Sequence, residues 1–254
     1  MKITFLGTGT SQGVPVIACD CAVCRSLNPK DKRLRSSILI ESDSTRLVVD
    51  TGPDFRYQML REGIDRLDAV VFTHEHKDHL AGLDDVRAFN YKQQAAMEVF
   101  ANESVQNALK REFYYIFSDF KYPGIPLVNL NTISADEAFT VGDIRLSPIE
   151  VMHYKLPVLG FRINDFTYLT DAKTVNETER EKIRGTKVLI VNALQRESHI
   201  SHFTLSEALA FIKDINPEKA YLTHISHKLG LHDEVLAELP ENVELAYDGL
   251  QIAI

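Results

Sequence analysis

Short runs in which apolar and β-branched residues dominate recur along most of this chain, and Gly, Pro, Asn or Asp bounds most of them. Runs of this length and composition predict β-strands. We expect strands at residues 3–6, 37–41, 47–50, 69–72, 98–101, 139–141, 144–150, 159–163, 166–170, 188–191, 220–223, 244–246 and 251–254.

Longer segments carry apolar residues at helical spacing between these strands. One begins after Thr204 with Glu207 three positions on, which is the pattern of a capping box. We expect helices at residues 55–62, 79–89, 103–111, 176–183, 205–215 and 232–239. In each half, strands come first and helices follow, which predicts an α/β fold of two packed β-sheets with helices outside and a site at one edge.

Composition describes an ordinary globular protein of 254 residues, 44% apolar and 25% charged. No apolar run is long enough to cross a bilayer, and the first residues read as a strand rather than a secretory signal, so we expect a cytosolic protein without a membrane partner. The net charge of −8 argues against broad binding of nucleic acid. It permits a small anionic substrate, because bound metal ions reverse the local field.

We find no linker that divides the chain, and therefore expect a single domain over residues 1–254. The least regular segment, residues 113–132, is rich in aromatic residues and contains Pro-Gly-Ile-Pro. Such a segment is either a lid that faces the substrate or an ordinary surface loop. Symmetric homodimers are common, but no interface is identifiable from the sequence.

A His-x-His-x-Asp-His run follows the strand predicted at 69–72 and is the most informative feature of the chain. In an extended segment the first two imidazoles point to the same side, and the last two residues follow where a helix begins. One short loop can therefore begin two adjacent metal sites, and imidazole with carboxylate suits zinc, manganese or iron. The residues are His74, His76, Asp78 and His79.

Further candidate ligands follow other predicted strands. His153 closes an apolar strand, Asp171 ends another, and His224 and His227 lie three residues apart after a third. Each is more often an ordinary polar residue when taken alone. As a set of strand-end ligands they indicate a metal centre.

The three cysteines, Cys19, Cys21 and Cys24, all lie within six positions. An odd number in a chain without an export signal does not make a disulfide framework. Three thiolates suit one soft metal ion that needs a fourth ligand from elsewhere, while a redox trio or three buried cysteines are the alternatives.

This order of motifs resembles the metallo-β-lactamase fold superfamily, whose fold is an αββα sandwich. The motifs that carry the resemblance are Gly-Thr-Gly at 7–9, Asp-Thr-Gly at 50–52, the His run and the strand-end ligands. By position, the resemblance implies one metal held by His74, His76 and His153. It implies a second held by Asp78, His79 and His224, with Asp171 as the bridge and Asp50 as the carboxylate that steadies the metal loop.

Within the superfamily, an early Cys-x-Cys-x-x-Cys and a late Thr-His-x-Ser-His resemble a narrower branch. That branch is typified by the phosphoribosyl cyclic phosphate phosphodiesterase of phosphonate breakdown. The resemblance implies a structural zinc held by the three cysteines and His227, besides two divalent ions, manganese or zinc, in the active site.

For chemistry, the resemblance implies hydrolysis of a small, cyclic phosphodiester by a hydroxide that two metal ions activate. His202 matches the proton donor of the branch, with His199 as its competitor, and Asp78 is the other candidate catalytic side chain. Arg87 aligns with an arginine of the branch and either binds a second phosphate of the substrate or lies on a solvated helix face.

Two other functions share these motifs. Transfer-RNA 3′-end processing uses the same ligands, but it needs a basic arm to grip RNA, and this chain is acidic. A non-catalytic accessory protein, as in pyrroloquinoline quinone synthesis, resembles the cysteine motif but has a degraded metal run. The seven ligands present here favour an enzyme that acts on a small phosphorylated molecule.

Overall fold

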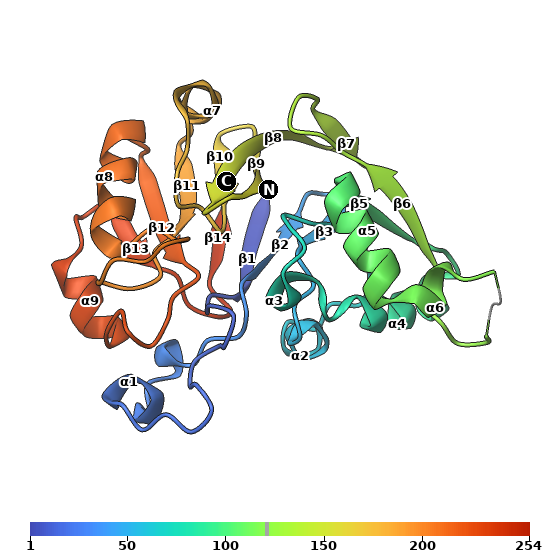
Figure 1. Cartoon of the computed structure of the whole chain (residues 1–254), viewed down its shortest axis with the longest axis horizontal. Helices are drawn as coiled ribbons and strands as arrows, with labels where there is room; N and C mark the ends of the chain where they lie inside the picture. Colours follow the sequence, from blue (N-terminus) through green and yellow to red (C-terminus); the bar gives the residue numbers. More distant parts are fainter. Residues whose placement is uncertain (120–121) are drawn as a thin grey trace.

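Two mixed β-sheets lie face to face in the computed structural model, which describes residues 1–119 and 122–254 (Figure 1). Helices α8 and α9 cover the outer face of one sheet, and α2 to α5 lie on the other side of the molecule (Figure 1). This is the predicted αββα sandwich. None of the helices in the described ranges is long and apolar enough to cross a membrane.

The first sheet comes mostly from the N-terminal half of the chain. Its neighbours β3, β4, β5 and β6 run parallel to one another, while β14, β1, β2 and β3 pair antiparallel. In spatial order its strands are β14 (Gln251–Ala253), β1 (Lys2–Gly7), β2 (Ser37–Glu41), β3 (Arg46–Val49), β4 (Ala69–Val71), β5 (Met97–Ala101) and β6 (Val128–Thr132).

The second sheet comes from the C-terminal half. Here β10 to β13 run parallel, and β7 to β10 pair antiparallel. Its strands are β13 (Val243–Leu245), β12 (Lys219–Thr223), β11 (Val188–Asn192), β10 (Phe166–Leu169), β9 (Leu156–Ile163), β8 (Ile144–His153) and β7 (Phe139–Val141).

Helices connect the parallel strands and are mostly short. Asn102, Asn176 and Thr204 cap α5, α7 and α8, and Thr204 forms the predicted capping box with Glu207. The helices are α1 (Ala22–Arg25), α2 (Phe55–Arg61), α3 (Lys77–Leu80), α4 (Arg87–Gln93), α5 (Glu103–Glu112), α6 (Tyr114–Phe117), α7 (Glu177–Ile183), α8 (Leu205–Ile215) and α9 (His232–Glu238), with 3-10 turns η1 (Pro29–Asp31) and η2 (Leu83–Val86).

Apolar side chains fill three layers. Strand β2 shows why, because Ile38 and Ile40 belong to the core between the sheets while Leu39 belongs to the core under α2 and α5. A strand buried on both faces reads as a continuous apolar run instead of an alternating one. The two sheets are thereby fixed against each other, and with them the strand ends that carry the candidate ligands.

The single helix predicted at 79–89 is wrong, because the structure divides this segment into α3, η2 and α4. The division falls at Gly82, whose amide donates to the carbonyl of Thr51. A Cβ on Gly82 would lie 2.2 Å from the carbonyl oxygen of Gly52. The chain passes so close to the 50–52 loop that an α-helix cannot continue.

The segment at 113–132, predicted as irregular, includes helix α6 and strand β6. Strand β6 pairs with β5, and Asn129 and Asn131 both donate to Glu98 on that neighbour. The predicted lid spans residues 120–121, which lie outside the described residues.

Candidate active site

The candidate ligands are brought together by the carboxyl ends of strands. Strands β3 and β4 are parallel, so the loops that carry Asp50 and the His run leave the first sheet at one edge. Strands β10, β11 and β12 are also parallel, so Asp171 and His224 leave the second sheet at one edge. These two edges meet, and His153 joins them from the end of β8.

One group of four side chains consists of His74, His76, His153 and Asp171, whose ligand atoms all lie within 4.8 Å of one another. His74 Nε2 is 3.1 Å from His76 Nδ1 and 3.6 Å from Asp171 Oδ2. His153 Nδ1 donates to the carbonyl of Ser201 at 2.8 Å, which leaves its Nε2 free to bind an ion.

A second group consists of Asp78, His79, Asp171 and His224, again within 4.8 Å. His79 Nε2 lies 3.2 Å from Asp78 Oδ2 and 3.4 Å from Asp171 Oδ2. His224 Nδ1 lies 3.0 Å from Asp171 Oδ1. Asp171 therefore belongs to both groups, in the position of a bridge. We call these seven residues the active-site cluster.

Asp50 orients two imidazoles from behind. Its Oδ2 accepts from His79 Nδ1 at 2.7 Å and from the Thr73 hydroxyl at 2.8 Å. The Thr73 oxygen lies 2.9 Å from His74 Nδ1, so that nitrogen donates to it. Both imidazoles are thereby fixed with Nε2 unprotonated and directed at the cluster.

Backbone conformation at the cluster is unusual. Asp50 and His224 adopt left-handed φ angles of 65° and 55°. Residues other than glycine adopt this region at a cost in free energy, and such residues concentrate at functional sites. The surrounding hydrogen bonds, among them those of Asp50 to Thr73 and His79, hold the strained loops in place.

The residues present fit a pair of divalent ions. His79 Nε2 is fully buried and has no hydrogen-bond partner in the described structure. Burial opposes charge on His79, yet Asp78, Asp171 and Asp50 raise its pKa well above the usual value. Three carboxylates around one buried imidazole leave an excess of negative charge, which divalent cations balance, and the imidazole and carboxylate set suits zinc or manganese.

A cavity of about 260 Å³ opens above this cluster. It is walled by residues that the sequence analysis did not select, among them Thr10, Ser11, Leu194 and Ser201. Thr10 Oγ1 lies 3.3 Å from His224 Nε2. The available signal was the polar Thr-Ser pair directly after Gly-Thr-Gly at 7–9.

Both candidate proton donors, His202 and His199, line the cavity, and their ring centroids are 5.1 Å apart. His202 is the deeper of the two, with Nε2 3.8 Å from Asp171 Oδ2. Burial lowers the pKa of His202 to about 3, although Asp171 opposes the shift.

Arg87 does not line this cavity. It pairs with Asp84 at 3.0 Å and borders a different hollow of about 420 Å³ beside Tyr91 and Tyr122. Its position does not support the predicted contact with a second phosphate in the active site.

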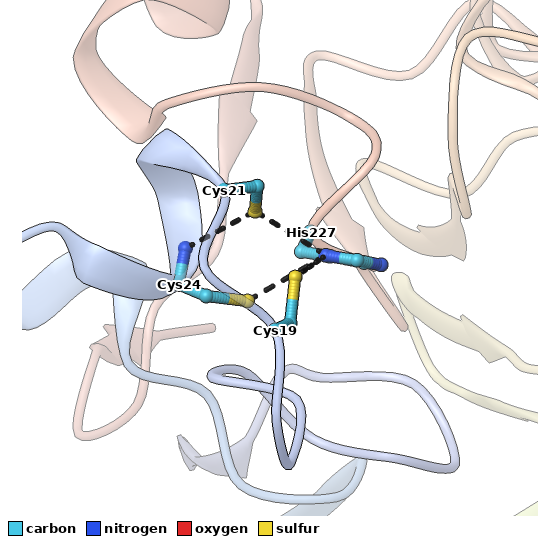
Figure 2. Close-up of side chains that lie close together, drawn as sticks. All are labelled: Cys19, Cys21, Cys24 and His227. Atoms are coloured by element: carbon cyan, nitrogen blue, oxygen red, sulfur yellow. Dashed lines mark hydrogen bonds between the residues drawn. The ribbon is translucent and has the colours of Figure 1, made fainter.

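A separate cluster, the sulfur cluster, consists of Cys19, Cys21, Cys24 and His227 (Figure 2). The three sulfurs lie 3.2, 3.4 and 3.5 Å from His227 Nδ1. The Cys24 amide lowers the pKa of Cys21 to about 6, while burial raises that of Cys24 to about 11. Three sulfurs and one nitrogen around one point form a donor set suited to tetrahedral zinc.

Comparison with known proteins agrees with this geometry. A family model described as a beta-lactamase superfamily domain matches residues 45–225. The crystal structure of a new diphosphatase from the PhnP family is 38% identical with a TM-score of 0.93, covering 100% of this chain and 97% of that one. Zn(2+)-bound PqqB from Methylobacterium extorquens, 18% identical with a TM-score of 0.82 over 100% of both chains, shares the fold.

A Porphyromonas gingivalis protein named octanoyltransferase is 41% identical over 256 residues. The match takes in 100% of this chain but 52% of that protein, so the chain spans about half the length of this relative.

The chain belongs to the metallo-β-lactamase fold superfamily. Within it, the match along the whole chain to the diphosphatase places it in the PhnP-like branch, and the fold with its His/Asp cluster makes it a metal-dependent hydrolase.

Proposed function

We propose that this protein is a phosphodiesterase that hydrolyses a small, disubstituted phosphate, and that a cyclic phosphodiester is its preferred form. The observation that carries the proposal is the sharing of Asp171 by two groups of ligands at the floor of a small cavity. A pair of divalent ions, when bound, supplies a hydroxide at neutral pH and neutralises charge on the phosphoryl oxygens.

The protein's own residues divide the remaining work. His74, His76 and His153 hold one ion, Asp78, His79 and His224 the other, and Asp171 lies between them. His202 stands over the same floor and donates a proton to the departing oxygen. Because burial keeps its imidazole neutral in the free protein, the proton must arrive with a negatively charged neighbour, and the substrate's phosphate is one.

The size of the cavity favours a small substrate. A volume of about 260 Å³ accommodates a sugar phosphate but no folded RNA. The net charge of −8 likewise weighs against transfer-RNA processing. The diphosphatase of the PhnP family adds P–O–P linkages as the second linkage to test, since they too contain disubstituted phosphorus.

Acyl transfer, the activity in the name of the Porphyromonas gingivalis relative, finds less support. Among the described residues that line the cavity, Leu194 is the one apolar side chain, whereas an eight-carbon chain needs an apolar channel. A non-catalytic role fits poorly with seven ligands oriented by buried hydrogen bonds.

The test is turnover by manganese- and zinc-loaded protein of a ribose cyclic phosphate, a dinucleoside diphosphate, a precursor transfer RNA and an octanoyl thioester. We expect the cyclic diester to be opened fastest and the RNA and thioester to be inert. Cleavage of the RNA alone would replace the proposal with the processing enzyme, and cleavage of the thioester alone would replace it with acyl chemistry.

His202→Ala separates proton donation from metal chemistry. We expect a fall of roughly 10²–10⁴-fold for an alkyl leaving group and a much smaller fall for p-nitrophenolate, which departs without a proton. Metal content, measured alongside, should be unchanged. Full activity on the alkyl ester would remove His202 from the mechanism.

A further inference from the structure

His199 lies on the wall of the active-site cavity and has no role in the mechanism above. The loop from β11 to α8 carries it, and the same loop places Ser201 and His202 on the same wall. The loop is fixed to the metal ligands, because the Ser201 carbonyl accepts from His153 Nδ1 at 2.8 Å. His199 therefore stands at a defined distance from the reacting phosphorus.

The proton of His199 can be placed from its contacts. The backbone N–H of Ser201 donates to His199 Nδ1 at 3.3 Å, so this nitrogen is an acceptor. Burial lowers the pKa of His199, so the imidazole is neutral and its single N–H is on Nε2. In the described ranges no protein group accepts from Nε2, which leaves a free donor at the wall of the cavity.

The charge around His199 is positive. The charged side chains that act on it are His153, Lys173 and Lys228, and each lowers its pKa further. Lys173 is bound to Glu207 through contacts of 2.8 and 2.9 Å. Lys228 is exposed and makes no ion pair with any described residue, so its charge is available to a ligand.

This arrangement differs from that of His202 and of Arg87. His202 faces the carboxylate of Asp171, and Arg87 is paired with Asp84 beside another hollow. A free N–H donor in a positive field is the chemistry that binds a phosphoryl oxyanion.

We propose that His199 and Lys228 form an anion subsite that holds a second phosphoryl group of the substrate, beside the one that is hydrolysed. The inference rests on the proposed function for the position of the reacting phosphorus. It narrows the substrate to small molecules with two phosphoryl groups, and it leaves His202 alone as the proton donor.

The test is calorimetric binding of inorganic phosphate and of pyrophosphate to zinc-loaded protein, with retained zinc measured after each titration. We expect pyrophosphate to bind more tightly than phosphate. His199→Phe, which keeps a ring but removes the donor, should weaken pyrophosphate about tenfold. Lys228→Met should weaken it about threefold, and phosphate binding should change in neither variant.

Two controls separate binding from structure. His199→Gln keeps an N–H donor at similar reach and should restore most of the pyrophosphate affinity. Lys155→Met removes another exposed lysine, in the hairpin directly after His153, and should change neither affinity. Equal binding of the two anions by the wild type, equal losses for both anions, or a loss in Lys155→Met as large as in Lys228→Met would overturn the subsite.

This readout does not depend on catalysis. A protein that prefers pyrophosphate but hydrolyses no diester or diphosphate would keep the subsite and refute the proposed function. A protein that hydrolyses diesters without this preference would do the reverse.

Discussion

The active-site cluster and the sulfur cluster receive ligands from one short loop, His224 and His227, yet the protein supports them in different ways. In the active-site cluster, His74, His79 and Asp171 are almost wholly buried, and hydrogen bonds from Asp50, Thr73 and Ser201 fix the imidazoles.

The sulfur cluster is built from a protruding N-terminal loop, and its residues contact mainly one another (Figure 1, Figure 2). A small apolar group around Val14 and Val23 is the core associated with it. The difference indicates that the protein shapes the active site before ions bind, whereas zinc itself organises the sulfur cluster.

The largest effect that would sharpen this contrast is expected from Asp50→Asn. The amide NH₂ of Asn donates where Asp50 accepts, so His79 would have to accept at Nδ1 and carry its proton on Nε2, which faces the cluster. We expect roughly a 10–100-fold loss of activity or of affinity for active-site metal, with zinc at the sulfur cluster retained.

Asp68→Asn is the matched control, since this carboxylate accepts from the Arg46 amide at the start of β4 and lies far from His79 in the sheet. Metal titration and kcat/KM measure both variants. An unchanged Asp50→Asn protein would show that the ions alone orient the imidazoles.

A second test acts on the sulfur cluster. Cys21→Ser removes a ligand and the cap of α1, so zinc content should fall by about one ion per chain. We expect Tm to fall by about 5–10 °C, as for a loss of roughly 2–3 kcal/mol in a domain of this size.

Asp20→Ala, in the same loop and with an exposed side chain that pairs only with Arg25, should leave both quantities unchanged. Scanning calorimetry with zinc analysis measures the set. Wild-type stability and zinc content in Cys21→Ser would refute the zinc assignment.

The smallest effect concerns pH beneath the sulfur cluster. His232 is buried, and its Nδ1 lies 3.1 Å from Arg33 Nη2, so burial and the arginine lower its pKa to about 4. The unfolded chain takes up this proton near pH 6.5, so the contribution of neutral His232 is present above about 6.5 and is lost toward pH 4.

Tm should therefore fall less on acidification from pH 7 to 5 in His232→Gln than in the wild type. Release of zinc by protonated cysteines occurs in both proteins and cancels in the comparison. Parallel curves of Tm against pH would contradict the assignment.

The sequence predicted the parts of the fold in which local pattern and final environment agree. The fully apolar β2 and the capping box at Thr204 are examples. Strand β6 was missed because Asn129 and Asn131 are poor strand formers, and their pairing with Glu98 arises from a neighbour distant in sequence. The break at Gly82 likewise depends on the 50–52 loop, which helical periodicity cannot reveal.

The site shows the same division. Spacing selected the seven ligands because imidazoles and carboxylates rarely gather at so many strand ends unless they bind metal. Thr10 and Ser201, by contrast, are ordinary polar residues in sequence and acquire meaning only when the cavity brings them beside His224 and His153.

The shared loop also sets an order of events during synthesis on the ribosome. His224 and His227 follow every other ligand of their clusters along the chain, and backbone hydrogen bonds join Ile225 to Thr8 and Thr10. A nascent chain that ends before β12 can complete neither cluster, although all its cysteines and most of its histidines have emerged. Both clusters become complete together, so metal loading is one of the last steps in making this protein.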